Sequence, residues 1–247
     1  MTDAAIAVIP ARLNSQRFPR KVLYPFHGRP LISHVYRELK KAKCLSRVIV
    51  ATDSKLVYRT VTDFGGEAAM TSARHRTGSD RVAELLRRLK VDIIVNFQAD
   101  NLGLKAAVVD RAVARMKADP HIEYATLARR LRSDSELQDP NVVKVVTADD
   151  GRALWFSRLP IPHLQRSGKG SQVKQFAFLA HIGVYLFRRR GLARFARRRR
   201  TRLEKAESLE QLRILEYGET MMVFPTTGRS VSVDTPRDLR KLEKLYR

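Results

Sequence analysis

Cationic and small polar side chains follow the first apolar run of the chain. Arg12, Ser15 and Lys21 come shortly after residues 5–9, an apolar segment short enough to be a buried strand. Cations and backbone amides at the end of such a strand are typical of a phosphate site in an α/β protein. The glycine spacing of a Walker A or dinucleotide-binding motif is absent, so side chains would hold the phosphates. A solvated basic surface loop is the alternative interpretation.

A carboxylate occupies the equivalent position after another apolar run. Gln98 and Asp100 follow residues 91–97, which read as a central parallel strand. At the carboxyl end of the sheet, Asp100 could hold a divalent cation that bridges to substrate phosphates. It could instead cap a helix beginning near Lys105. We favour the metal role.

Residues 74–81 contain a third candidate segment, RHRTGSDR. Arg74, Ser79 and the glycine backbone could lie beside a nucleotide base or ribose. Ser79 or Asp80 could equally be the N-cap of the amphipathic helix expected at 82–89.

The order of strands and helices predicts how these segments meet. Apolar runs and helical periodicity alternate along the chain, which predicts a doubly wound, mostly parallel α/β sheet in a single domain, 1–247. The alternating segment 142–147, the turn 149–151 and the run 153–156 predict a β-hairpin. This hairpin interrupts the rhythm, so we expect 139–190 to be an inserted lid or dimer region. Further strands are expected at 47–51, 67–70, 91–97 and 124–128. Helices are expected at 31–39, 55–64, 82–89 and 106–118.

Composition narrows the class of protein. The chain has 247 residues, a single cysteine and no apolar stretch long enough for a bilayer, and its first residues do not form a secretion signal. These features predict a cytoplasmic protein. The net charge of +23 would attract polyanions, and nucleic acid is the second hypothesis. The arginine clusters 188–190 and 197–200 lack interleaved aromatics, so we interpret the charge as mostly solvated surface that could draw in an anionic substrate.

Seven motifs together resemble the 3-deoxy-manno-octulosonate cytidylyltransferase (CMP-Kdo synthetase) family. The likeness runs nearly from end to end, in order and at compatible spacing. The first motif is shared among sugar cytidylyltransferases, whereas HIGVY and LEQLR are more particular to the Kdo branch. The motifs are IPARLNSQRFPRKVL, HRTGSDR, QAD, DPNVVKVV, HIGVY, LEQLR and VDTPRDL.

The resemblance implies a nucleotide-diphospho-sugar transferase-like fold and a reaction. CMP would pass from CTP to the anomeric hydroxyl of 3-deoxy-D-manno-octulosonate (Kdo), giving CMP-Kdo and pyrophosphate for lipopolysaccharide synthesis, with Mg²⁺ as cofactor. A bacterial cytoplasmic homodimer is implied. Three alternatives stay open: another acidic sugar such as 8-amino-Kdo or a nonulosonate, a low-activity homologue, and a basic nucleic-acid-binding protein.

The resemblance also implies roles for individual residues. Arg12, Lys21 and Asp100 would be catalytic, and Asp100 and Asp234 would hold magnesium. The CTP-binding residues would be Ala11, Arg12, Ser15, Lys21, Arg74, Ser79 and Gln98. The sugar-binding residues would be Asn141, Arg158, His181, Tyr185, Glu210 and Gln211.

Two departures from the family pattern concern the site itself. The family reads QGDEP where this chain reads QADNL at 98–102, which restricts the backbone at Ala99 and removes a negative charge at Asn101. Arg20 stands where glycine is usual. We expect the fold and nucleotide binding to persist, with rate, metal affinity or sugar preference altered.

Overall fold

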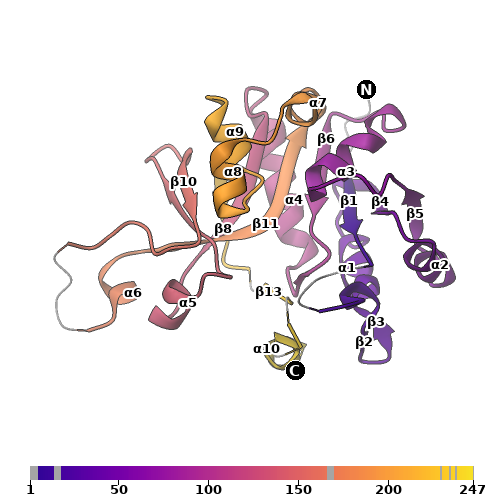
Figure 1. The fold of residues 1–247 in the computed structure, drawn as a ribbon, viewed down its shortest axis with the longest axis horizontal. Coiled ribbons are helices and arrows are strands. Elements are labelled where there is room, and N and C mark those ends of the chain that lie inside the picture. Colours follow the sequence, from indigo (N-terminus) through magenta and orange to yellow (C-terminus); the bar gives the residue numbers. More distant parts are fainter. Residues whose placement is uncertain are drawn as a thin grey trace.

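A nine-stranded sheet forms the centre of the molecule, with helices on both faces (Figure 1). The computed structural model describes residues 5–13, 18–165, 170–228, 230–233, 235–236 and 238–246. Alternate side chains of the first strand enter two different core clusters, Ile9 on one face and Val8 on the other. A strand buried on both faces is expected to be apolar throughout, as this one is.

The parallel half of the sheet confirms the predicted order. Its strands run β5–β4–β1–β6, and all are parallel. Parallel strands bring their carboxyl ends to one edge, so the residues after β1, β4 and β6 lie together. The bounds are β1 Ala5–Ala11, β4 Leu45–Thr52, β5 Glu67–Met70 and β6 Ile93–Phe97.

Amphipathic helices cover the two faces of this sheet. One core cluster takes the apolar sides of α1, α2 and α4, and the other takes those of α3, α7 and α9. Ser54 caps α2, since its hydroxyl accepts from Val57 N at 3.3 Å. The bounds are α1 Leu31–Leu39, α2 Lys55–Asp63, α3 Gly78–Glu84, α4 Ala106–Ala118, α7 Arg189–Arg197 and α9 Leu212–Glu216.

One prediction about a helix start is wrong, and one alternative role of Asp100 is excluded. Helix α3 begins at Gly78, not at Val82, and its N-cap is Thr77, whose hydroxyl accepts from Asp80 N at 3.1 Å. A separate 3₁₀ turn, η2 Leu85–Arg87, follows it. Asp100 does not cap α4, because Glu38 accepts from the Ala106 amide instead, at 3.0 Å.

The other half of the sheet is built around one long antiparallel strand. β11 (Leu179–Arg188) pairs with β6, β8 and β9, and its register shifts between Ile182 and Tyr185. The predicted hairpin is confirmed as β9 (Lys144–Thr147) and β10 (Ala153–Ser157). Because β9 pairs with β11, the hairpin continues the central sheet. β8 (Tyr124–Arg130) also pairs with β12 (Met222–Pro225).

Short elements complete the fold. Helices α5 and α6 lie to one side of the sheet, beyond the hairpin strands (Figure 1). The short elements are η1 Lys21–Leu23, β2 Pro25–Phe26, β3 Arg29–Pro30, β7 Asn101–Leu102, α5 Asp134–Gln138, α6 Gln172–Gln175, α8 Arg202–Glu207, β13 Val231–Ser232 and α10 Asp238–Tyr246. Among the described helices, none combines the length and apolarity needed to cross a membrane.

Much of the arginine run at 188–200 is tied into the fold. Arg188 is buried, and its guanidinium donates to the carbonyls of Met116 at 2.7 Å and Asp119 at 3.1 Å and pairs with Asp92. Arg198 pairs with Glu219 at 2.6 Å. The interpretation of this charge as solvated surface is therefore wrong for Arg188, because its side chain anchors β11 to the end of α4.

Candidate active site

The first loop and the third motif meet through an ion pair. Lys21 Nζ lies 3.0 Å from Asp100 Oδ2, and the two side chains are 11% and 28% exposed. Lys21 is positioned by η1, and Asp100 lies in the turn between β6 and β7. The structure thus joins two residues that are 79 positions apart in the chain.

The C-terminal segment reaches the same turn. β13 pairs with β7, and Val233 N donates to the carbonyl of Asp100 at 3.1 Å. Asp234 and Ser15 lie outside the described residues, so their predicted contacts with magnesium and CTP stay predictions. Among the described residues, no group of three or more His, Cys, Asp or Glu is arranged to hold a metal.

A cavity of about 320 Å³ opens beside these loops. It gathers four predicted residues from distant parts of the chain, one predicted for the nucleotide and three for the sugar. Ten residues line the cavity: Arg76, Thr77, Gly78, Gln98, Tyr185, Arg200, Glu204, Ser208, Glu210 and Gln211. We call it the catalytic cavity below.

Glu210 closes the start of helix α3. Its carboxylate accepts from Ser79 N at 3.1 Å and from the hydroxyls of Thr77 and Ser79. Backbone amides at a helix start have no partner within the helix, so a carboxylate there satisfies them. Burial nevertheless raises the pKa of Glu210 above its ordinary value.

A buried amide chain positions Gln98 in the cavity. Gln98 Nε2 donates to Asn96 Oδ1 at 3.2 Å, and Asn96 Nδ2 donates to Ser79 Oγ at 2.9 Å. Ser79 is fully buried. In this structure its hydroxyl therefore positions Asn96 and, through Asn96, Gln98. Gly78 allows the close approach, because a Cβ there would lie 2.6 Å from Gln98 Nε2.

Tyr185 and Gln211 form a second buried pair. The phenol donates to Gln211 Oε1 at 3.0 Å, and burial raises the pKa of Tyr185 well above its usual value. Gln211 is 1% exposed, and its Nε2 has no hydrogen-bond partner within the described part of the chain. A buried donor without an acceptor is uncommon, and here it borders the cavity, where an acceptor of a ligand could satisfy it.

Three other predicted sugar residues do not line this cavity. His181 Nε2 bonds to Thr126 Oγ1 at 2.8 Å, and burial lowers the pKa of His181 to about 3, which keeps the ring neutral. Arg158 donates to the carbonyls of Glu207 at 2.8 Å and Pro140 at 3.0 Å. Asn141 is exposed and donates to Asp139. Their contact with sugar stays a prediction.

The remaining nucleotide residues lie around the carboxyl edge of the parallel strands. Ala11 ends β1 and is buried, and the Arg12 guanidinium donates to the carbonyl oxygen of His75. Burial and the nearby Arg81 guanidinium lower the pKa of Arg12. Arg74 is exposed on the loop before α3.

Sequence reasoning missed the ion network that supports the cavity wall. Arg213 is 2% exposed at its side chain and pairs with Glu204 at 2.7 Å and with Asp80 at 2.9 Å. Its guanidinium also stacks over the Phe195 ring, 4.0 Å from the ring centroid. The network joins α3, α8 and α9, which carry or flank the lining residues. The arginine of LEQLR was the available signal, but charge alone predicts an exposed position.

The departures from the family pattern have local structural consequences. Asn101 Nδ2 donates to the Gly183 carbonyl at 2.8 Å, which a carboxylate could not do. Ala99 is buried in the core and has no left-handed backbone. Arg20 does adopt the left-handed conformation, with φ of 55°, where glycine would be unstrained.

Magnesium suits the donors at this site. Mg²⁺ is commonly held by one or two carboxylates together with substrate phosphates and water. Asp100 supplies one carboxylate, and the Lys21 ammonium beside it shows that the position accepts a cation.

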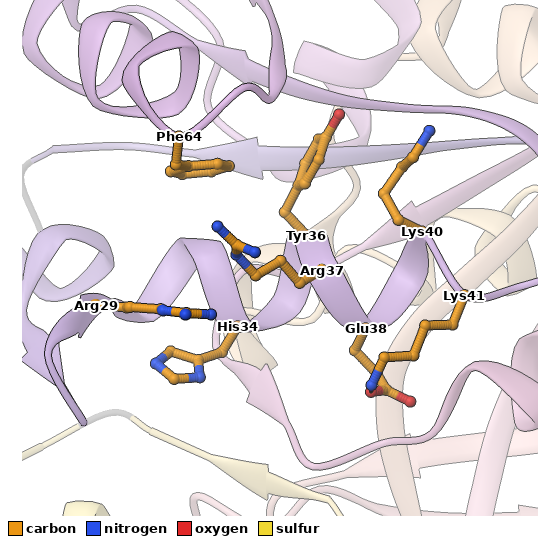
Figure 2. Close-up of a pocket in the computed structure, with 8 residues that line it drawn as sticks. All are labelled: Arg29, His34, Tyr36, Arg37, Glu38, Lys40, Lys41 and Phe64. Carbon is orange, nitrogen blue, oxygen red and sulfur yellow. The ribbon is translucent and has the colours of Figure 1, made fainter.

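A larger hollow on α1 contains none of the predicted site residues. It measures about 590 Å³ and is lined by Arg29, His34, Tyr36, Arg37, Glu38, Lys40, Lys41 and Phe64. Four of these residues, His34, Tyr36, Arg37 and Glu38, belong to the single helix α1, and Figure 2 shows their side chains projecting from it. Its size alone does not make it the site.

Comparison with known proteins agrees with the fold. The topology is that of α/β nucleotidyltransferases: an inositol-1-phosphate CTP transferase from T. maritima matches 99% of this chain and 95% of its own at a TM-score of 0.68 and 16% identity. The model of the family described as cytidylyltransferase matches residues 6–221. The chain therefore belongs to the cytidylyltransferase family.

Two curated relatives carry the same name. The chain is 47% identical to the 3-deoxy-manno-octulosonate cytidylyltransferase of Geobacter metallireducens, over 98% of this chain and 97% of the relative. The enzyme of the same name from Geobacter sulfurreducens is 43% identical over 97% and 98%. A solved structure of CMP:2-keto-3-deoxy-manno-octonic acid synthetase complexed with CTP matches 98% of both chains, with a TM-score of 0.88 and 35% identity.

Proposed function

We propose that this protein transfers CMP from CTP to the anomeric hydroxyl of Kdo, releasing pyrophosphate, in the bacterial cytoplasm. One observation carries the proposal most directly. Gln98, Tyr185, Glu210 and Gln211 line a single cavity next to the Lys21–Asp100 pair. A nucleotide site and a sugar-acid site must adjoin for such a transfer.

The chemistry needs positioning and charge neutralisation. The sugar hydroxyl attacks the α-phosphate in line, the bond to the leaving phosphate breaks, and negative charge builds on pyrophosphate. Lys21 and Arg12 would neutralise that charge. Asp100 would hold Mg²⁺, which supplies Lewis-acid stabilisation when it is bound.

The far wall of the cavity suits a sugar acid. Gln211 Nε2 offers a free buried donor, and Glu210 offers a carboxylate acceptor for hydroxyls. Arg76, which lines the cavity, supplies positive charge for a carboxylate. Internal pairing of Arg188 and Arg198 counts against the nucleic-acid alternative, because paired arginines are not available to phosphate.

A substrate panel tests this proposal. Pyrophosphate release is measured with CTP, UTP and ATP against Kdo, 8-amino-Kdo and a nonulosonate, with Mg²⁺. We expect the highest kcat/KM for CTP with Kdo. Preference for another sugar acid would overturn the substrate. Tight CTP binding without turnover on any pair would favour the low-activity homologue.

We further propose a homodimer formed through the region 139–190. Three large exposed apolar side chains lie in this range: Leu154 in β10 at 59%, Leu159 just after it at 69%, and Phe176 at the end of α6 at 42%. Exposed apolar surface often marks protein–protein contacts. Light scattering should give twice the chain mass for the wild type and the monomer mass for Leu154→Lys/Leu159→Lys. A monomeric wild type would contradict this.

A further inference from the structure

A second hollow lies on the outer side of the loop that precedes α3. It measures about 560 Å³, and six arginines line it from four separate segments. They are Arg74, Arg76, Arg87, Arg198, Arg200 and Arg213. We call it the basic hollow.

Internal ion pairs use up the acids around the basic hollow. Asp80 pairs with Arg213 at 2.9 Å. Glu84 accepts from Ser72 N at 2.9 Å and pairs with His75. No lining carboxylate within the described residues is therefore left to neutralise another arginine.

Half of the arginines remain uncompensated. Arg198 and Arg200 pair with Glu219 and Glu204, whereas Arg74, Arg76 and Arg87 are exposed and have no acidic partner among the described residues. Guanidinium groups that converge on one hollow match the geometry of phosphate oxygens, which they can bind in pairs. Three such groups call for an anion with more than one phosphate.

The position of the basic hollow indicates where that anion comes from. Arg76 and Arg200 line both this hollow and the catalytic cavity. A triphosphate or a pyrophosphate is present next door if the proposed reaction is correct. Nucleic acid fits less well, because the lining residues, all described, include no Phe, Tyr or Trp on which a base could stack.

We propose that the basic hollow binds a di- or triphosphate: either the released pyrophosphate or the triphosphate of a second CTP. The assignment to these sources rests on the proposed function, whereas the binding itself does not. Phosphate held there would change the positions of Arg76 and Arg200 and so couple to the catalytic cavity.

Calorimetry on the full chain tests the site. Pyrophosphate is titrated into protein saturated with CTP, without sugar acid, so that catalysis cannot occur and the catalytic cleft is filled. We expect the wild type to bind pyrophosphate and Arg87→Gln, at a lining residue with no predicted part in CTP or sugar binding, to bind it about tenfold more weakly. The control is Arg37→Gln, which removes one positive charge from the hollow on α1 (Figure 2) and should bind as the wild type does.

The outcomes separate the sources and the two proposals. If the wild type binds a second CTP, the variant does not, and pyrophosphate fails to bind in the presence of CTP, the basic hollow binds the nucleotide. Equal pyrophosphate binding by variant and wild type, or equal losses in both charge variants, overturns the site even if turnover is intact. Single-stranded RNA that binds the wild type and resists displacement by pyrophosphate overturns it too. If the protein shows no turnover but the variant still weakens pyrophosphate binding, the proposed function is wrong and the phosphate site stands.

Discussion

Two ion-paired centres flank the catalytic cavity, and they differ in burial. The Lys21–Asp100 pair is partly open, with 28% of the carboxylate side chain exposed. The Arg213–Glu204 pair is 2% and 1% exposed and is joined by Asp80. Charges that must accept ions and phosphates have to remain accessible, whereas charges that only hold elements together can be sealed. We therefore expect the open pair to serve the chemistry and the sealed network to position the elements around it.

The largest expected effect lies in the sealed network. Arg213→Met leaves Glu204 buried without its main partner, so the free energy of unfolding should fall by about 3–5 kcal/mol. Urea denaturation measures it. Arg190→Met is the control, since the Arg190 side chain is 62% exposed in its pair with Glu123 and should cost less than about 1 kcal/mol. Equal losses would erase the distinction between sealed and open pairs.

The open pair should show the opposite signature. Lys21→Met should lower kcat by about 10²–10³, as expected for one lost charge-stabilising group, while the urea midpoint hardly moves. Steady-state pyrophosphate release provides the rate. Lys41→Met, at a 68% exposed side chain paired with Glu38, is the matched control. A stable and fully active Lys21→Met protein would show that Lys21 does not stabilise charge in the reaction.

A smaller effect is expected where the sealed network meets the cavity. Gln211→Leu removes the acceptor for Tyr185 and the unpartnered donor, so KM for the sugar acid should rise about tenfold, with KM for CTP unchanged. Gln172→Leu, in the short helix α6, serves as the control for the same substitution. A rise in KM for CTP, with KM for the sugar acid unchanged, would indicate that Gln211 contacts the nucleotide and not the sugar acid.

The smallest effect concerns a neutral anchor on β11. The pKa of His181 in the folded protein is about 3, below its ordinary 6.5. Between these two values His181 binds a proton in the unfolded chain but not in the folded one. Stability conferred by neutral His181 is present above pH 6.5 and is lost as the pH falls toward 3. From pH 7 to 5.5 the loss should be about 1 kcal/mol. The urea midpoints of the wild type and His181→Phe should converge as the pH falls. If the two midpoints instead fall in parallel with pH, His181 does not have the lowered pKa that its burial implies.

The sequence predicted the parallel core well because its signals are local. Apolar runs and caps identify β1, β4, β6 and α2, and parallel topology then brings Arg12 and Gln98 to one edge. Nothing local predicts that Glu210 closes helix α3, because this contact spans 131 positions. Arg213 was equally hidden, since a buried arginine and a solvated one have the same sequence pattern. Lys21 and Asp100 were found locally, because each follows an apolar run, whereas Tyr185, Glu210 and Gln211 were found through a family resemblance, which carries long-range information that periodicity lacks.

The most direct test of the account is metal binding at Asp100. Mn²⁺, a spectroscopic substitute for Mg²⁺, is titrated into CTP-loaded wild type, Asp100→Asn and the control Asp110→Asn, and bound ion is counted by electron paramagnetic resonance. We expect Asp100→Asn to bind the ion at least about tenfold more weakly than the other two, with a wild-type urea midpoint. Equal Mn²⁺ affinity in all three proteins would contradict the central claim that Asp100 presents the metal to the triphosphate.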